Sequence, residues 1–157
     1  MYPLLEKKDW KILSDLASEI ASIVIADMDN GADDNRVQSY EEAALYQKLC
    51  DQIEFMEQKY GPHPIILDTK ADFTDDINEK IELKRAAIQI CLPNDNKLRG
   101  NILKDLSEIY LDEINDIAKA KQAITLAIND LKLDNDSNDI EDAFSIQKRI
   151  LESEKLE

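Results

Sequence analysis

The stretch from Ile102 to Leu131, ILKDLSEIYLDEINDIAKAKQAITLAINDL, decides the fold of this chain. Apolar residues recur at intervals of three and four on both sides of a short turn at Ile114 and Asn115, which is the spacing of two amphipathic helices. The apolar positions are Leu103, Leu106, Ile109 and Tyr110 before the turn, and Ile117, Ala120, Ile124, Ala127, Ile128 and Leu131 after it. A turn this short predicts two antiparallel helices packed against each other.

The same helical spacing continues in both directions from this hairpin. It predicts further helices over residues 5–28 and 39–60, from Asp72 or Thr74 up to Pro93, and over 140–151, and it places the start of the hairpin's first helix at Asn96. Only three glycines and four prolines occur in 157 residues, too few for a turn-rich β-sandwich or barrel. We therefore predict an all-α chain of about six antiparallel helices, arranged as stacked helical hairpins or as a helical bundle, in a single domain over residues 1–157.

Polar and proline-containing segments separate the predicted helices. Residues 29–35 have loop composition, and Ser39 with Glu42 has the spacing of a capping box for the second helix. The run 65–67, Ile-Ile-Leu, follows Gly-Pro-His-Pro and is expected to be an extended connection or a short strand. The polar run 134–139 is expected to separate the last two helices.

The third helix is the least regular of the predicted set. Asp72 or Thr74 is its expected amino-terminal cap, and Pro93 ends it. Its apolar face includes either Leu83 or Lys84, because the three-and-four spacing admits both positions.

Residues 87–131 resemble one tetratricopeptide repeat. Leu103, Leu106, Ser107 and Tyr110 match the pattern of the first helix of that repeat, and Ala120, Ile124 and Ala127 match the second. The resemblance implies that small residues let the two helices approach closely, while large ones fill the gap between neighbouring hairpins. The chain departs from the pattern in two places: Ala87 and Ala127 lie 40 positions apart instead of about 34, and the turn before Asp116 is one residue longer.

The charge of the chain is strongly negative. The sequence contains 34 Asp and Glu residues and 19 Lys and Arg residues, which gives a formal net charge of -15. A surface of this sign repels the phosphates of a nucleic acid, so no nucleic-acid partner is expected. A basic protein partner is the better expectation, because charge complementarity accelerates and orients association.

The acidic residues are clustered along the sequence, and these clusters are the candidate partner-binding sites. The first contains Asp134, Asp136, Asp139, Glu141 and Asp142, and the second contains Asp72, Asp75, Asp76 and Glu79, followed by Glu82. A third contains Asp27, Asp29, Asp33 and Asp34. If the hairpins stack, these clusters are expected to merge into one negative rim; the alternative is that they are solvated residues at helix starts.

Catalytic and metal-binding motifs are missing from the sequence. His63 is the only histidine and lies between two prolines, so it is expected to be a surface or loop-packing residue. The acidic loops beginning at Asp27 and Asp134 lack the glycine and the final glutamate of a calcium-binding loop. We therefore expect no enzyme activity, no cofactor and no metal; an enzyme would need a site that follows no recognisable motif.

Cysteine usage and the first residues of the chain bear on its compartment. Cys50 and Cys91 each lie in a helical apolar pattern and are expected to be buried, reduced thiols. The opening segment MYPLLEKKDW has no basic stretch followed by an apolar one, and no apolar run is long enough to span a membrane. The sequence predicts a cytoplasmic protein without a membrane partner.

Two functions are compatible with these features. In type, the chain is similar to small acidic bacterial immunity proteins, and that likeness implies an inhibitor that masks the active site of a basic, nuclease-type toxin. The alternative, implied by the tetratricopeptide resemblance, is a chaperone or adaptor that binds a peptide or secreted protein in a concave groove. Aromatic anchors are expected among the following residues where they are exposed: Tyr40, Tyr46, Phe73 and Phe144.

Overall fold

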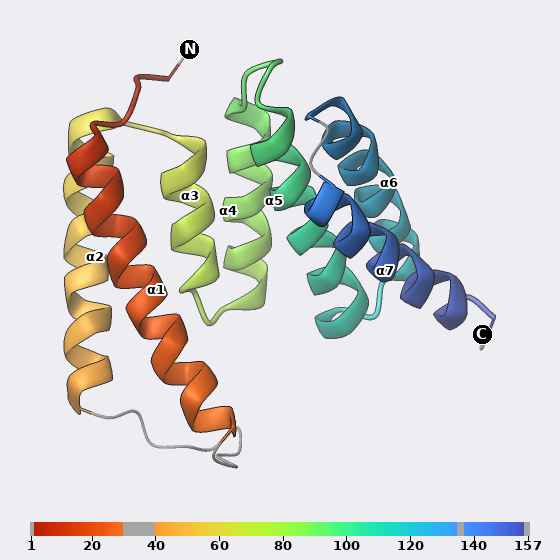
Figure 1. Cartoon of the computed structure of the whole chain (residues 1–157), viewed down its shortest axis with the longest axis horizontal. Helices are drawn as coiled ribbons and strands as arrows, with labels where there is room; N and C mark the ends of the chain where they lie inside the picture. Colours follow the sequence, from red (N-terminus) through yellow and green to blue (C-terminus); the bar gives the residue numbers. More distant parts are fainter. Residues whose placement is uncertain (1, 30–39, 135–136, 156–157) are drawn as a thin grey trace. The chain divides into compact units, whose positions relative to one another are not determined.

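A computed structural model describes residues 2–29, 40–134 and 137–155, and the all-α prediction is confirmed for them (Figure 1). The α-helices are α1 (Lys7–Asp29), α2 (Tyr40–Tyr60), α3 (Pro64–Asp72), α4 (Ile77–Ile90), α5 (Asn96–Glu108), α6 (Ile117–Asp134) and α7 (Ser137–Ser153). A π-helical turn, η1 (Ile109–Glu113), continues α5. No strand occurs in the described ranges.

The contacts within the chain divide it into two compact units. The N-terminal unit covers Tyr2–Ile66, and the C-terminal unit covers Leu67–Glu157, so the boundary falls inside α3. Length alone favours one domain, but residues near each other in space gather into these two separate groups.

The N-terminal unit is a hairpin of α1 and α2, which lie side by side in Figure 1. The buried side chains of α2 follow helical spacing and line one face: Leu45, Leu49, Ile53 and Met56. Leu13 and Ile20 of α1 are also buried. A charged network holds the start of α1 against the end of α2, since the buried Asp9 carboxylate accepts hydrogen bonds from Lys59 Nζ and the Tyr60 hydroxyl, both at 2.7 Å.

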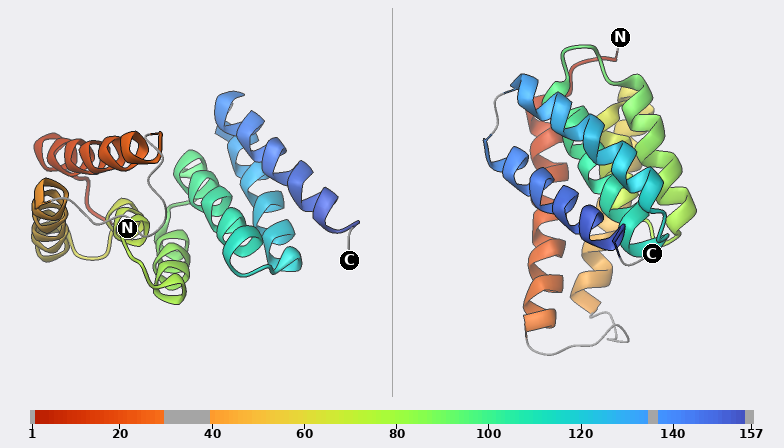
Figure 2. Two further views of the ribbon diagram at one scale, coloured as in Figure 1. Left: turned by 90° about the horizontal axis from the view of Figure 1, so that it is seen from below. Right: turned by 90° about the vertical axis from the view of Figure 1, so that its right-hand side faces the viewer.

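The C-terminal unit is a stack of antiparallel helices in two layers. Figure 2 shows α5 and α7 in one layer and α4 and α6 in the other. Its core consists mainly of apolar residues from α5, η1, α6 and α7: Leu103, Leu106, Tyr110, Leu111, Ile117, Ala120, Ala123, Ile124, Ala127, Ile128, Leu131, Ala143, Ile146 and Ile150. The hairpin that opened the sequence analysis is therefore the centre of this unit.

Small residues let α5 and α6 pack closely. The buried Ser107 hydroxyl donates a hydrogen bond to the carbonyl oxygen of Ala120 across the pair at 2.9 Å. At Gly100, an added Cβ would lie 2.8 Å from Leu131 Cγ, closer than carbon atoms pack. The expected close approach of these two helices is present in the structure.

The turn between α5 and α6 explains the extra residue noted in the sequence. In η1 the Ile114 N–H donates to the Ile109 carbonyl oxygen at 3.2 Å, the bonding pattern of a π-turn that contains one residue more than an α-turn. Asn115 follows with a φ of 55°, a left-handed conformation that asparagine tolerates better than most residues. The longer turn is thus absorbed without breaking the hairpin.

The prediction for residues 65–67 is wrong, because they belong to α3. Pro64 takes the first helical position, where its missing N–H costs nothing, and the buried His63 accepts a hydrogen bond at Nδ1 from the Ile65 N–H at 3.2 Å. The Tyr2 ring packs edge-on against His63 at a centroid distance of 4.5 Å. This additional helix raises the predicted six to seven in the described ranges.

Other local predictions also change. Asp76, not Asp72 or Thr74, caps α4 by accepting hydrogen bonds from the N–H groups of Asn78 and Glu79. Helices α6 and α7 extend over most of the polar run 134–139, and Ser39 of the expected capping box lies outside the described residues.

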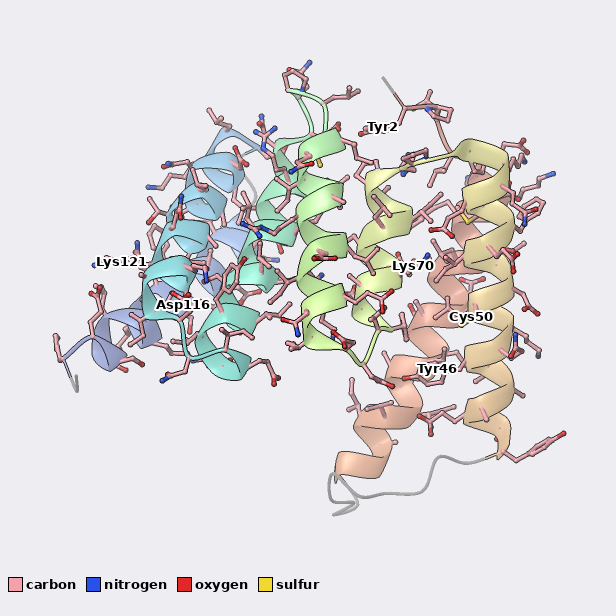
Figure 3. All side chains as sticks on the ribbon, turned by 180° about the vertical axis from the view of Figure 1, so that it is seen from behind. Tyr2, Tyr46, Cys50, Lys70, Asp116 and Lys121 are labelled. Carbon is pink, nitrogen blue, oxygen red and sulfur yellow. The ribbon has the colours of Figure 1, made fainter. Side chains whose placement is uncertain are left out.

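The prediction that both cysteines are buried thiols is wrong in part. Both cysteines are free, but Cys50 is exposed on α2 (Figure 3) and Cys91 is only partly buried, so the prediction of burial fails for Cys50. Within the described residues, no helix combines the length and the apolar character needed to cross a bilayer.

Candidate binding surfaces

The two predicted acidic clusters of the C-terminal unit do not form one rim. Asp72, Asp75, Asp76 and Glu79 lie where α4 begins, whereas Asp134, Asp139, Glu141 and Asp142 lie where α6 ends and α7 begins. Figure 1 shows these places at opposite ends of the antiparallel stack. Asp136 and the third cluster fall in segments whose side chains lie outside the described residues.

Lysines of α5 partly balance the cluster at the start of α7. The Asp139 carboxylate accepts a hydrogen bond from Asn101 Nδ2 at 3.1 Å and lies 3.6 Å from Lys104 Nζ. Lys104 Nζ also lies 3.8 Å from Asp142. These carboxylates therefore contribute to the packing of α7 on α5, while Asp134 and Glu141 remain exposed.

The cluster at the start of α4 divides between structural and exposed residues. Asp76 caps the helix, and Asp72 binds the ammonium group of Lys84 at 2.7 Å. Asp75 and Glu79 are exposed and form no ion pair with any described residue. Within this cluster, they are the members whose charge is open to a partner.

Lys84 is the charged residue that sequence reasoning left undecided, and the structure buries it. Its side chain is 1% exposed, and its ammonium group lies 2.9 Å from Asp68, 2.7 Å from Asp72 and 3.2 Å from Asp105. The three carboxylates are close enough together to hold a metal ion, but the ammonium group already occupies the space between them. The sequence signal for this arrangement was a lysine on the apolar face of α4.

Burial and charge oppose each other in this cluster. Loss of solvent raises the pKa of Asp68 to about 6 and also raises the pKa of Asp105, in both cases against the attraction of Lys84. Burial alone would lower the pKa of Lys84, but its carboxylate partners outweigh that effect and raise it. The cluster is a structural charge network that joins α3, α4 and α5.

A groove on the N-terminal unit has the charge expected for a basic partner. It has a volume of about 480 Å³ and lies between α1 and α2. We call it the acidic groove, and its lining residues are Ile12, Asp15, Leu16, Glu19, Lys48, Asp51 and Gln52. Three carboxylates and one ammonium group thus surround two apolar side chains, and Ile12 is 46% exposed.

The carboxylates of the acidic groove are not locked into the fold. Asp15 pairs with the exposed Lys11 at 2.6 Å, one turn away on the same helix, and Asp51 accepts a hydrogen bond from Gln47. Glu19 forms no hydrogen bond or ion pair with a described residue. A Lys or Arg side chain could lay its aliphatic part on Ile12 and Leu16 and bring its charged group to these carboxylates.

The aromatic candidates differ in exposure. Tyr40 is 92% exposed at the start of α2, and Phe144 of α7 is 43% exposed with Lys132 Nζ 5.3 Å from its ring centre. Tyr46 and Phe73 are half-buried. Tyr40 and Phe144 are the two members of this set that offer a large apolar surface.

Comparison of the sequence with protein-family models finds no match, and comparison with curated proteins finds none either.

Proposed function

We propose that this chain is a protein-binding module that docks a basic partner protein through its acidic surface, with the acidic groove as the contact site. The observation that carries this proposal is the groove itself, where Asp15, Glu19 and Asp51 border the apolar side chains of Ile12 and Leu16. Its charge has the same sign as the net charge of -15, so long-range attraction and local contact favour the same kind of partner.

Each part of the groove has a physical role in this proposal. Exposed carboxylates attract a cationic protein and raise the association rate, an effect that salt screens over about 8–10 Å. Ile12 and Leu16 provide the apolar contact that slows dissociation. The sharpest form of the proposal is an immunity protein, which covers the phosphate-binding surface of a basic, nuclease-type toxin and so excludes its substrate.

Identifying the partner and measuring the salt dependence of its binding test the proposal. We would capture proteins from the source cells on the immobilised chain, identify them by mass spectrometry, and measure binding of the purified partner in about 0.05 M and about 0.5 M salt. The expected partner is a single basic protein whose association slows by about tenfold or more at the higher salt. An acidic partner, or salt-independent association, contradicts the proposal, and nuclease inhibition tests its sharpest form.

A charge-matched pair of variants tests the groove. One variant carries Asp15→Asn, Glu19→Gln and Asp51→Asn; the control carries Asp75→Asn, Glu79→Gln and Glu82→Gln, which removes the same number of charges from exposed positions near the start of α4. We expect the first to weaken binding by about tenfold and the control to change it by less than about threefold. The reverse result would move the interface to the α4 cluster.

A second candidate function is an adaptor that takes a peptide in a groove. The observation that favours it is a second groove with the opposite charge, in the C-terminal unit.

A further inference from the structure

The second groove lies between α4 and α6, with α5 and η1 as its floor. Figure 3 views this side of the C-terminal unit, with α5 between the other two helices. The groove has a volume of about 290 Å³, and we call it the cationic groove. Its lining residues are Arg85, Ile88, Gln89, Leu103, Leu106, Tyr110, Lys119, Gln122, Ala123 and Leu126.

Among the described residues, no carboxylate lines the cationic groove, although the chain as a whole is strongly acidic. Arg85 is exposed and forms no hydrogen bond or ion pair with a described residue. Lys119 Nζ lies 2.6 Å from Asp116 and 5.6 Å from the centre of the Tyr110 ring. The Asp116 carboxylate raises the pKa of Lys119, and the positive charge of Arg85 acts in the opposite direction with a smaller effect. The two cations therefore repel each other at this groove, and a bound anion would relieve that repulsion.

The lining has a direction along the helices. Helices α4 and α6 run the same way in the antiparallel stack, and the first lining residue of each is a cation, Arg85 or Lys119. Ile88 and Leu126 follow about one and two turns later, and Leu103 of α5 lines the same groove. The two cations thus come first along their helices, and the later lining residues are Ile88 and Leu126 together with the polar Gln89; Leu126 is 47% exposed.

We propose that the cationic groove binds the carboxyl terminus of a partner polypeptide that ends in an apolar residue. The terminal carboxylate lies between Arg85 and Lys119, and the last side chain lies against Ile88, Leu103 and Leu126. A volume of about 290 Å³ holds one or two residues, not a long segment. A terminal residue supplies a carboxylate and an apolar group within that space, whereas an internal acidic residue would need room for chain on both sides.

The probes that test this proposal are fluorescent short peptides with Leu, Ile, Val, Phe or Met as the last residue, each prepared as the free acid and as the amide. We expect at least one free acid to bind about tenfold more tightly than its amide, because only the acid places a full charge between the two cations. Backbone amide shifts should change in α4, α5 and α6. Equal binding of acid and amide, or no binding of any free acid at millimolar concentration, overturns the proposal.

Single substitutions locate the site. Arg85→Gln and Lys119→Gln should each weaken binding of the free-acid peptide by about fivefold or more and leave binding of the amide peptide unchanged. Lys121→Gln is the matched control, since Lys121 is an exposed cation of α6 that pairs with Glu154 and does not line the groove. If Lys121→Gln weakens binding as much as Arg85→Gln, the effect is one of net charge and the proposal is wrong.

Two further measurements distinguish peptide binding at the cationic groove from binding at the acidic groove and from binding of a small molecule. The variant with Asp15→Asn, Glu19→Gln and Asp51→Asn should bind the acid peptides as the unmodified chain does, so the two sites fail independently. Binding of octanoate by the groove without binding of any peptide would assign it to free carboxylic acids and overturn the proposed source.

Discussion

The two units of this chain carry grooves of opposite charge. In the N-terminal unit, carboxylates surround an apolar floor, and in the C-terminal unit two cations border an apolar floor with no carboxylate among the described lining residues. The net charge of -15 has the same sign as the charge of the first groove and the opposite sign to that of the second. The difference teaches that composition predicts one kind of surface charge, whereas the local arrangement of side chains gives two.

The units also differ in how they hold their internal charges. The N-terminal unit places Lys59 at the edge of the fold, where its side chain is 29% exposed between Glu6 and Asp9. The C-terminal unit buries Lys84 among three carboxylates. A buried charge depends on its partners far more than an exposed one, so the two lysines should respond differently to removal.

The largest expected effect comes from removing the buried charge. Lys84→Met leaves Asp68, Asp72 and Asp105 close together without a counter-charge, and we expect it to lower the free energy of unfolding of the C-terminal unit by about 3–5 kcal/mol. Hydrogen exchange of α4 and α5 amides measures the loss. Trp10, the only tryptophan, reports on the N-terminal unit by fluorescence.

Lys59→Met is the matched variant in the N-terminal unit and should have a smaller effect. The predicted contrast between the two lysines is wrong if Lys84→Met leaves hydrogen exchange in α4 and α5 unchanged. It is also wrong if Lys59→Met lowers the free energy of unfolding of its unit by more than Lys84→Met does.

The pH dependence of stability should have opposite signs in the two units. In the C-terminal unit the folded chain keeps the Asp68 proton up to a pKa of about 6, while the unfolded chain releases it near the ordinary value of 3.8. Unfolding therefore releases protons between these values, and the contribution of Asp68 to stability falls as pH rises from about 4 to about 6, by up to roughly 3 kcal/mol. Asp68→Asn should flatten this slope, as hydrogen exchange corrected for intrinsic rates would show.

The N-terminal unit should respond in the other direction. Lys59 lowers the pKa of Asp9 and of Glu6, so the folded chain releases these protons at lower pH than the unfolded chain. The stability that they contribute is present above the ordinary values of 3.8 and 4.5 and is lost as pH falls through the folded values. Trp10 fluorescence in urea, measured from about pH 3 to about pH 6, follows this loss.

A smaller effect tests the close packing of α5 and α6 in the C-terminal unit. Gly100→Ala places a methyl group against Leu131 and the Ala127 carbonyl oxygen, and it should cost about 1–3 kcal/mol through displacement of α6. Exchange in α5 and α6 should accelerate. A neutral or stabilising result would mean that Leu131 moves without strain.

Much of the fold could be predicted from the sequence, because apolar spacing is a local signal. The hairpin over 102–131 and the bounds of α2 follow directly from it. Helix α3 was missed because Ile65-Ile66-Leu67 has no polar face to show a period. Its helical state depends on the His63 cap, a local hydrogen bond, and on the burial of Ile66 and Ala71, which is a feature of the tertiary structure.

The candidate sites were much harder to predict. The predicted clusters were residues close together in sequence, and four of their members are caps or ion pairs of the fold: Asp72, Asp76, Asp139 and Asp142. The acidic groove draws its residues from two helices and the cationic groove from three helices and η1. Nothing in a single sequence marks Glu19 and Lys48, or Arg85 and Lys119, as neighbours across a groove.

The smallest expected effect is also the one on which the proposed function depends. Asp15→Asn, Glu19→Gln and Asp51→Asn together should cost the N-terminal unit less than about 1 kcal/mol, because Asp15 and Lys11 are a solvent-exposed pair and Glu19 has no partner among the described residues. Removing three like charges also relieves repulsion in an acidic chain. Urea unfolding followed by Trp10 fluorescence measures this cost. If it is small while partner binding falls by about tenfold, the carboxylates serve recognition; if stability falls in parallel with binding, they serve the fold.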